Sequence, residues 1–288
     1  MGERVDPVRK PRDDEIDVHG LTHPGRVRKE NQDHFLICQL RKQIHLHMSS
    51  LPDSVRLPDG SERLAFLAMV ADGVGGGPGG ETASRLAVAG VAQYVSESID
   101  AYYTADSTDG AALTGALYAA ALRAHADLLE ASELSPGDGR MATTLTLWIG
   151  VWPSIYLLQV GDSRHYVLRD GELVQSTRDQ TIGQDLVDSG VLDDHQAATL
   201  RWSDVLSSAI GGSESAPVVT RIDSGWGHVH LLCSDGLTRH VSDERIHERL
   251  ASMTSAKQVC EDLLQDALDG GGTDNVTLIV GRAIKRGD

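Results

Sequence analysis

Apolar residues follow two periodicities along the first half of the chain. Short apolar runs of strand length, separated by polar or turn residues, occupy residues 16–23, 34–40 and 63–72. Two later segments, residues 81–99 and 111–132, instead place apolar residues at helical spacing. The helical spacing is clearest in the second segment, at Leu113, Leu117, Ala121, Ala124 and Leu128. The pattern therefore predicts three strands followed by two helices.

The second half of the chain is built differently. Between residues 142 and 177, short apolar runs alternate with turn sequences, which is typical of an antiparallel meander. A polar, mixed segment, residues 180–216, comes next. Strands are then predicted at residues 218–222, 228–236 and 275–284, and amphipathic helices at 242–251 and 256–268. Strands and paired helices in blocks, without strict βαβ alternation, predict an α+β fold in which helices cover antiparallel sheets.

The chain is predicted to form one domain. No linker of disordered composition and no repeat divides residues 16–284. Residues 1–15 are charged, contain proline and lack periodicity, so we expect a disordered tail there. Hydrophobic residues make up 40% of the 288 residues, which is enough for a sizeable core. Because aromatic residues are only 4%, this core must consist mainly of Leu, Val, Ile and Ala.

Charge limits the possible partners. With 42 acidic and 26 basic residues the formal net charge is −16, which argues against binding to nucleic acid or to anionic membranes. The same surplus permits carboxylates to gather at a divalent-metal site. No window approaches 18 consecutive apolar residues, and the charged N-terminus is unlike a secretory signal. Cys38, Cys233 and Cys260 form neither a disulfide framework nor a CxxC pair, so a reducing, cytoplasmic setting fits best.

Four aspartates lie beside predicted strands. Asp33 precedes one strand, Asp72 and Asp235 end two others, and Asp274 precedes the last. Carboxylates held at strand ends repel one another unless cations lie between them. Hard cations such as Mg²⁺ or Mn²⁺ bind carboxylate and carbonyl oxygens while keeping several waters. A single aspartate at such a position is more often a turn or capping residue than a metal ligand. The residues around each aspartate are therefore needed to distinguish the two roles.

Those neighbours form six short motifs in a fixed order. The motifs are R-x-x-x-Q-D from Arg28, V-A-D-G-V-G-G from Val70, M-A-T-T-L from Met141, V-G-D-S-R from Val160, L-L-C-S-D-G-L from Leu231 and G-T-D-N-V-T from Gly272. Each motif alone is weak, but the ordered set resembles the metal-dependent Ser/Thr phosphatases of the protein phosphatase 2C family, in their bacterial form. The resemblance covers about residues 17 to 283.

The resemblance implies a role for each matching position. Asp72 would bridge two Mn²⁺ or Mg²⁺ ions, and the carbonyl of Gly73 would bind one of them. The other ion would be held by Asp235 and Asp274. Asp33 would act mainly through a metal-bound water. Arg28 would clamp the substrate phosphate, a task that suits a guanidinium fork. The alternative interpretation is that Arg28 is a solvated arginine in a basic cluster with no role in the site.

The resemblance also implies a fold, a reaction and partners. The fold would be an α-β-β-α sandwich of two antiparallel sheets, with the metal site at one end between the sheets and a flap at about residues 180–216. Two ions would activate a shared water for in-line attack on phosphoserine or phosphothreonine, without a phosphoenzyme. The implied partners are phosphorylated proteins, substrates of a Ser/Thr kinase, and the protein is expected to be a monomer.

Three positions depart from the family pattern. Gln32 stands where many members carry Glu, and Val74 stands where some eukaryotic members have a histidine proposed as general acid. Bacterial members often hold a third ion through an aspartate before the M-G-T-T-like motif. In this chain Asp138 is the only nearby acid, so a possible third site would pair Asp138 with Asp235, and Ala142 replaces the motif's glycine.

Several other patterns suggest different chemistry. Gly75, Gly77 and Gly80 satisfy the dinucleotide fingerprint G-x-G-x-x-G, but Asp72 would repel a pyrophosphate and no ribose-binding acid follows. Asp162-Ser163-Arg164 lacks the G-x-S-x-G elbow of a nucleophilic serine and is interpreted as a turn near the site. The pairs His45-x-His47 and His228-x-His230 have no third metal ligand in view.

Two alternative functions stay open at this stage. Cys233 and Arg239 have the C-x₅-R spacing of a cysteine phosphatase loop, although a buried strand cysteine is the simpler interpretation. EDTA would leave such an enzyme active. A catalytically weak, phosphoprotein-binding regulatory module on the same fold is the second alternative. Loss of metal ligands would mark such a module, yet Asp72, Asp235 and Asp274 are all present.

Overall fold

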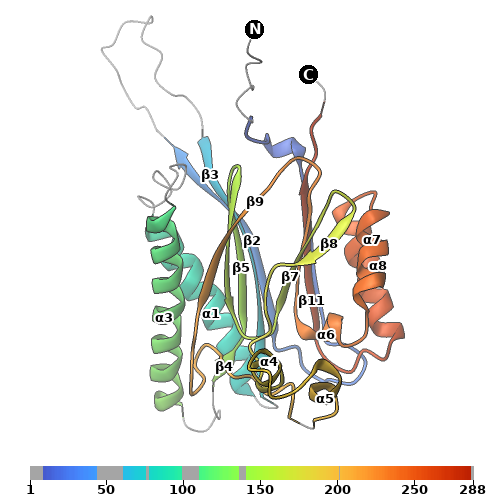
Figure 1. Cartoon of the computed structure of the whole chain (residues 1–288). Coiled ribbons are helices and arrows are strands. Elements are labelled where there is room, and N and C mark those ends of the chain that lie inside the picture. The colour runs from blue at the N-terminus through green and yellow to red at the C-terminus, as the bar shows by residue number, and fades with distance from the viewer. Residues whose placement is uncertain are drawn as a thin grey trace, which may run out of the picture.

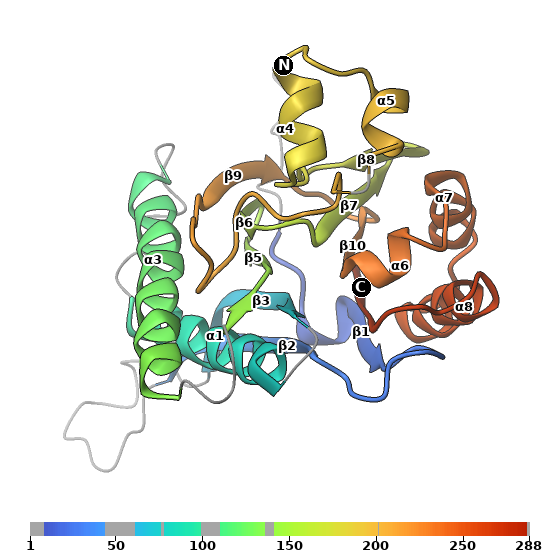
Figure 2. The ribbon, with the colours of Figure 1, turned by 90° about the horizontal axis from the view of Figure 1, so that it is seen from below.

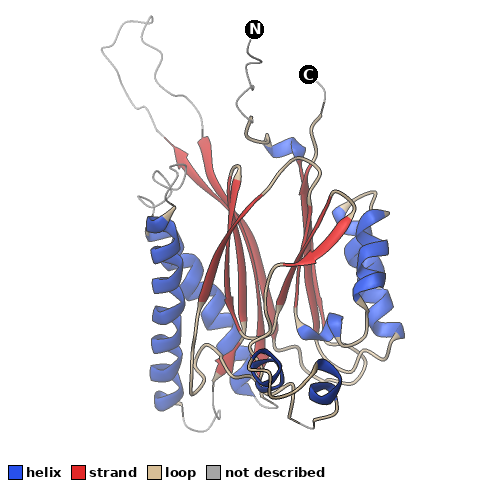
Figure 3. Ribbon diagram, viewed as in Figure 1, coloured by secondary structure: helices blue, strands red, loops and turns tan. Residues whose placement is uncertain are grey.

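Two antiparallel sheets lie face to face between two pairs of helices (Figures 1 and 3). The structure is a computed structural model that describes residues 9–43, 61–75, 78–98, 110–135, 141–200 and 202–286. The predicted α+β class and the α-β-β-α sandwich are confirmed by this arrangement. Within the described ranges, no helix combines the length and the apolar character that a membrane span requires.

The first sheet is covered by the two helices that the sequence predicts in the first half. Its strands, in spatial order, are β2 (Asp33–Gln43), β3 (Ser61–Val74), β5 (Leu145–Val151), β6 (Ser154–Val160) and β9 (Val218–Asp223), and the short β4 (Ala142–Thr143) pairs with the end of β3. The helices are α1 (Pro78–Glu97) and α3 (Ala111–Leu134). The five apolar positions predicted to form the inner face of α3 are all buried.

The second sheet joins the beginning of the chain to its last strand. Its order is β1 (Ile16–His23), β11 (Val276–Ala283), β10 (Val229–Cys233), β7 (Arg164–Arg169) and β8 (Glu172–Gln175). It is covered by α7 (Asp243–Ala251) and α8 (Ala256–Asp269). Both helices begin after a serine, Ser242 or Ser255, whose side chain accepts a backbone N–H of the first turn.

The predicted meander is divided between the two sheets. The hairpin β5–β6 belongs to the first sheet and β7–β8 to the second, so the chain crosses from one to the other at Gly161-Asp162-Ser163. Gly161 has φ +99°, and a Cβ there would lie 2.7 Å from Cγ2 of Thr144. Only glycine therefore fits this close turn. Strand runs and turns alone do not reveal such a change of sheet.

Strand β3 does not stop at Asp72, as the apolar pattern predicts, but continues through Val74. Gly73 and Val74 pair there with Thr143 and Ala142 of β4. A Cβ on Gly73 would lie 2.3 Å from the carbonyl oxygen of Gly80, so this glycine lets α1 approach the strand closely. The extension fixes the backbone of residues 72 and 73 on both sides of the strand.

The side chains of β3 explain its continuous apolar run. Leu67, Met69 and Ala71 face the helices α1 and α3, whereas Ala68 and Val70 face the second sheet. Both faces of the strand are therefore buried, which favours an uninterrupted hydrophobic sequence over an alternating one. A separate cluster under α7 and α8 forms the core on the other side of the sandwich.

The remaining elements lie at the two ends of the sandwich. Residues 9–15, which the sequence assigns to a disordered tail, carry a 3₁₀ turn (η1, Asp13–Glu15), and the buried carboxylate of Glu15 binds the Arg9 guanidinium at 2.6 and 2.7 Å. Residues 1–8 lie outside the described part of the chain. At the opposite end, α4 (Ile182–Asp188) and α5 (Asp194–Ala198) belong to residues 180–216, which we call the flap segment (Figures 1 and 2).

Candidate metal centre

Four strands bring the predicted aspartates to one end of the sandwich. Asp33 and Asp72 are direct partners in the β2–β3 register. Asp235 opens α6 (Asp235–Thr238), the turn that follows β10, and Asp274 lies two residues before β11. Because antiparallel neighbours begin where their partners end, these four positions meet at the same edge. The sequence interpretation of strand-end carboxylates converging in space fits this geometry.

A cavity of about 240 Å³ opens at this edge. Its lining includes seven charged side chains and several backbone and neutral groups: Arg28, Gln32, Asp72, Gly73, Val74, Gly75, Thr144, Asp162, Asp204, Leu206, Asp235, Arg239 and Asp274. Asp33 lies behind the lining and is only 3% exposed. The structure thus collects Arg28, Asp72, Gly73, Asp235 and Asp274 around one space, as the resemblance implies.

Two buried carboxylate oxygens have no hydrogen-bond partner among the described residues: Oδ1 of Asp33 and Oδ1 of Asp235. The second oxygen of Asp33 accepts a hydrogen bond of 2.8 Å from the Ser234 hydroxyl. Leaving a buried acceptor unpaired costs about 1–3 kcal/mol, and more when the group is charged. A cation next to these oxygens removes that cost, so the donor set fits divalent metal ions.

The pKa values of the buried carboxyls indicate the same need for positive charge. Burial, above all, raises the pKa of Asp33 to about 6 and that of Asp162 to about 8. The pKa of Asp72 is raised well above its usual value by burial and then by the charges of Asp33, Asp235, Asp162 and Asp274. A divalent cation reverses this logic, because it favours the ionised form of every carboxylate around it.

Two arginines supply part of that positive charge. Arg28 Nη2 lies 2.8 Å from Asp274 Oδ2, and this contact raises the pKa of Arg28. Arg239 Nε and Nη2 lie 2.7 and 2.6 Å from Asp235 Oδ2. Within the described ranges, no three acidic, histidine or cysteine side chains converge on one point. Such a set is not required, since Mg²⁺-like ions keep several waters and use one or two carboxylates each.

Two of the positions that depart from the family pattern also lie at the cavity. Gln32 and Val74 both line it, so neither an acid nor an imidazole stands there. The backbone N–H of Gln32 donates to the Asn275 side chain at 2.8 Å, which ties β2 to the segment that carries Asp274. Asp138, predicted for a third ion, lies outside the described residues, as do Gly77, His45 and His47.

Three cavity residues were missed or undervalued at the sequence level. Asp162, interpreted as a turn residue, lines the cavity at 9% exposure. Its place in V-G-D-S-R, one of the six motifs, is the signal that could have identified it. Asp204 of the flap segment carries no such signal. Arg239 was noticed only for its distance from Cys233.

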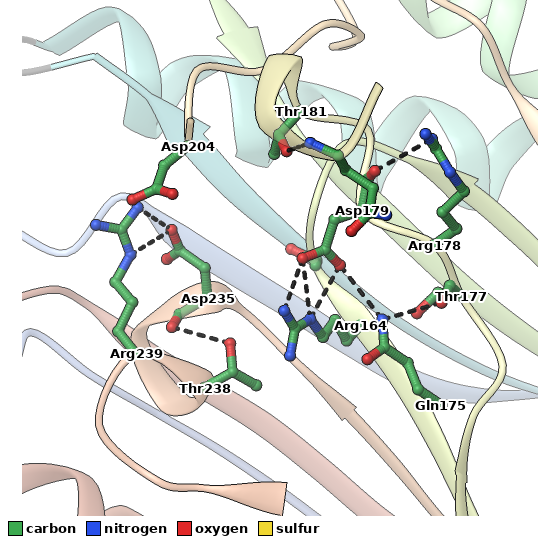
Figure 4. A network of polar contacts seen from close by, with 12 residues as sticks. Arg164, Gln175, Thr177, Arg178, Asp179, Thr181, Asp204, Asp235, Thr238 and Arg239 are labelled. Atoms are coloured by element: carbon green, nitrogen blue, oxygen red, sulfur yellow. Dashed lines mark hydrogen bonds and ion pairs between the residues drawn. The ribbon is translucent and has the colours of Figure 1, made fainter. Parts of the chain in front are cut away.

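The structure argues against Cys233 and Ser163 as nucleophiles. Cys233 is fully buried on β10, and burial raises the pKa of its thiol to about 12, so no thiolate is available. Ser163 is also fully buried, and its hydroxyl lies 2.7 Å from that of Thr144. Its neighbour Arg164 binds both oxygens of Asp179 and so fastens the residue just before the flap segment to β7 (Figure 4).

Fold and site together define an α-β-β-α sandwich with a carboxylate cluster suited to divalent cations. A family model described as protein phosphatase 2C matches residues 52–269 of the chain. The match covers more than half of the sequence. The chain therefore belongs to the protein phosphatase 2C family, which confirms the predicted resemblance.

Individual relatives agree with this assignment. The serine/threonine protein phosphatase PstP of Mycobacterium tuberculosis is 37% identical over 216 residues, which are 75% of this chain but 40% of PstP. The serine/threonine phosphatase stp of Listeria monocytogenes is 28% identical over 74% of this chain and 83% of its own length. This chain thus spans about two fifths of the length of PstP.

Solved structures of such phosphatases have the same architecture. A crystal structure of M. tuberculosis PstP superimposes with a TM-score of 0.74 at 31% identity, covering 94% of this chain and 99% of that one. The catalytic domain of PstP in complex with two manganese ions gives a TM-score of 0.71 at 31% identity, again covering 94% and 99%. The S. agalactiae serine/threonine phosphatase, at 23% identity, shares the fold with a TM-score of 0.75.

Proposed function

We propose that the protein is a Mn²⁺- or Mg²⁺-dependent phosphatase that hydrolyses phosphoserine and phosphothreonine in proteins. The observation that carries this proposal is the group of buried and half-buried carboxylates at the cavity, two of whose buried oxygens have no hydrogen-bond partner among the described residues. Family membership and the two manganese ions of PstP support the choice of cofactor. When bound, two such ions lower the pKa of a water and offset charge on the phosphate oxygens.

The chain's own residues hold and orient the reactants. Asp72 lines the cavity beside Gly73 and pairs with Asp33 in the β2–β3 register, which supports a role for Asp72 as the carboxylate that would be shared by two ions. Asp235 and Asp274 reach it from the second sheet. Asp33, fixed by Ser234, keeps one oxygen free to orient a water. This set divides the ligands between the two sheets.

Arg28 is placed to bind the substrate phosphate. Its guanidinium lies on the cavity wall and its side chain is 46% exposed, so it can exchange Asp274 for a phosphate once a cation holds that carboxylate. The two parallel N–H groups of a guanidinium match two phosphate oxygens. Phosphoryl transfer depends chiefly on positioning and charge stabilisation, which these groups supply.

Direct attack by water, without a phosphoenzyme, is supported by the lack of an available hydroxyl or thiol nucleophile in the part of the cavity that the structure describes. Among the described residues that line the cavity, the only hydroxyl belongs to Thr144. That hydroxyl accepts a hydrogen bond of 3.0 Å from the Asp72 N–H and contacts Ser163. The thiol of Cys233 is buried, so neither group can attack phosphorus.

The proposed partners are phosphorylated proteins that a Ser/Thr kinase modifies, and the proposed working unit is a monomer. The flap segment contributes Asp204 and Leu206 to the cavity, so it is placed to influence which phosphoproteins bind. The alternative of a phosphoprotein-binding module without catalysis has less support, because all four predicted metal-site aspartates are present.

The decisive experiment measures hydrolysis of p-nitrophenyl phosphate and of a phosphothreonine peptide with Mn²⁺ and with EDTA. We expect EDTA to abolish activity and Mn²⁺ to restore it. Asp72→Asn should lower kcat at least on the order of 100-fold, since losing even an outer partner of a metal ligand costs about 10–100-fold. Asp170→Asn, the same change at an exposed turn with φ +52°, should leave activity unchanged.

Three results would contradict the proposal. Full manganese-dependent activity in Asp72→Asn would remove that residue from the site. EDTA-resistant activity that Cys233→Ser abolishes would establish a cysteine phosphatase instead. Binding of the phosphopeptide with no hydrolysis at any Mn²⁺ concentration would favour the regulatory module.

A further inference from the structure

We propose that Arg239 occupies the place of a third cation at the metal centre, so that the chain binds two divalent ions and not three. This inference rests on the proposed function. It concerns the flap side of Asp235, the residue that the sequence pairs with Asp138 for a third ion. Arg239 is a positioning residue here, because it acts on the carboxylate of Asp235.

The two oxygens of Asp235 have different surroundings. Oδ1 is buried and has no hydrogen-bond partner among the described residues, which leaves it available to an ion. Oδ2 receives both Nε and Nη2 of Arg239, at 2.7 and 2.6 Å. One carboxylate can bridge two cations, one on each oxygen. In this chain a guanidinium already holds the second oxygen.

Other negative groups face the same guanidinium. In Figure 4 the guanidinium of Arg239 contacts Asp235, and Asp204 of the flap segment lies above it. Asp204 and Asp274 add to the favourable potential at Arg239, and Arg239 in turn stabilises the charged form of Asp162. Arg239 is therefore one of the two arginines of the cavity, and the one that faces Asp235.

The backbone makes this placement rigid. Asp235 is the first residue of α6 and Arg239 its C-cap, and the Arg239 N–H donates to the Asp235 carbonyl at 2.9 Å. Residues at i and i+4 lie on the same face of a helix, so the guanidinium reaches back to the carboxylate. A Cβ on Gly236 would lie 1.9 Å from the Asn275 carbonyl oxygen, so α6 rests directly on the segment before β11.

The test counts bound manganese by equilibrium dialysis of the full chain up to millimolar Mn²⁺. Wild type should bind two ions. Arg239→Ala and Arg239→Gln, which remove the charge with and without loss of side-chain length, should bind a third ion in the millimolar range. Arg239→Lys should stay at two ions because it keeps a cation in place. Arg245→Ala, which removes an arginine–aspartate pair between α7 and α8, is the matched control and should also bind two.

Each result decides the matter. Three ions on wild type, or two on both uncharged variants, would overturn the inference, although the phosphatase proposal would survive. Wild type that binds no manganese would instead refute the proposed function. The ion count separates the assigned role from a merely structural one, since loss of packing does not create an additional cation site.

Discussion

The layer between the two sheets has two regions that treat buried ionisable groups in opposite ways. At the edge, Asp33, Asp72 and Asp162 have raised pKa values. Deeper in, His165 and His230 stack with ring centroids 5.4 Å apart, and burial lowers the pKa of His230 to about 3. Burial drives both regions toward neutrality, because it penalises whichever form is charged.

The difference between the regions is access to a counter-charge. Asp72 and Asp162 line a cavity of about 240 Å³ whose wall includes two arginines, and Asp33 lies behind that lining. The imidazoles instead bind each other and Ser224, at 3.2 and 3.1 Å, beside a mainly apolar cavity of about 80 Å³. One region is therefore prepared for cations, whereas the other is a neutral part of the core. Buried titratable residues indicate a functional site only where a counter-charge can reach them.

The largest effect should come from disturbing the backbone under the acidic region. Gly236→Ala places a Cβ 1.9 Å from the Asn275 carbonyl oxygen, so α6 must move away from β11 and carry Asp235 with it. We expect a loss of stability of about 3 kcal/mol and a fall in kcat/KM on the order of 100-fold. Urea denaturation and phosphopeptide hydrolysis measure the two effects.

Gly115→Ala on α3 is the control, since no atom lies within 4 Å of its added Cβ. This change should raise stability by up to about 1 kcal/mol through helix propensity. Normal activity in Gly236→Ala would show that the acidic region tolerates a shift of α6. It would then be less clear that this region, unlike the histidine pair, is prepared for cations.

A smaller effect is expected from pH, with opposite signs in the two regions. His230 has a folded pKa of about 3 against 6.5 unfolded, so the unfolded chain binds the additional proton. The free energy of unfolding should therefore fall by about 2 kcal/mol between pH 6.5 and about pH 5. Asp162 has a folded pKa of about 8 against 3.8, so its contribution in the metal-free protein should rise as pH falls from 8.

Urea denaturation of the metal-free protein across this pH range separates the two contributions. His230→Gln should flatten the loss below pH 6.5, and Asp162→Asn should flatten the gain below pH 8. If the free energy of unfolding had the same slope against pH in wild type and in both variants, the two regions would not differ in protonation.

The smallest effect should come from replacing two serines, one that contacts the acidic region and one that contacts the histidine pair. Ser234 donates to Asp33 at 2.8 Å, and the Ser224 hydroxyl contacts His230 at 3.1 Å. Each Ser→Ala change should cost about 1 kcal/mol of stability. Only Ser234→Ala should also weaken Mn²⁺ binding, by about tenfold, because Asp33 loses the group that orients it. Equal manganese affinity in the two variants would contradict the conclusion that only the acidic region binds cations.

The sequence predicted the elements better than their assembly. Periodicity located α3 and its five inner residues, and it found the continuous run of β3, since these signals are local. The crossing at Gly161 was not predictable, because strand alternation is the same whichever sheet receives the next hairpin. The strand-end aspartates were found through their motifs. Asp204 and the role of Arg239 depend on contacts with segments far away in sequence, which no local pattern records.

The pairing of β1 with β11 has a consequence for the order of folding. Ile16 lies opposite Ala283, so the second sheet cannot close until β11 has been synthesised. Contacts this distant in sequence form slowly, because a long loop must be closed first. Asp274 arrives on the segment that completes this sheet. A nascent chain would therefore acquire its metal centre only after β11 has been made, when the first sheet and its helices are already available to pack.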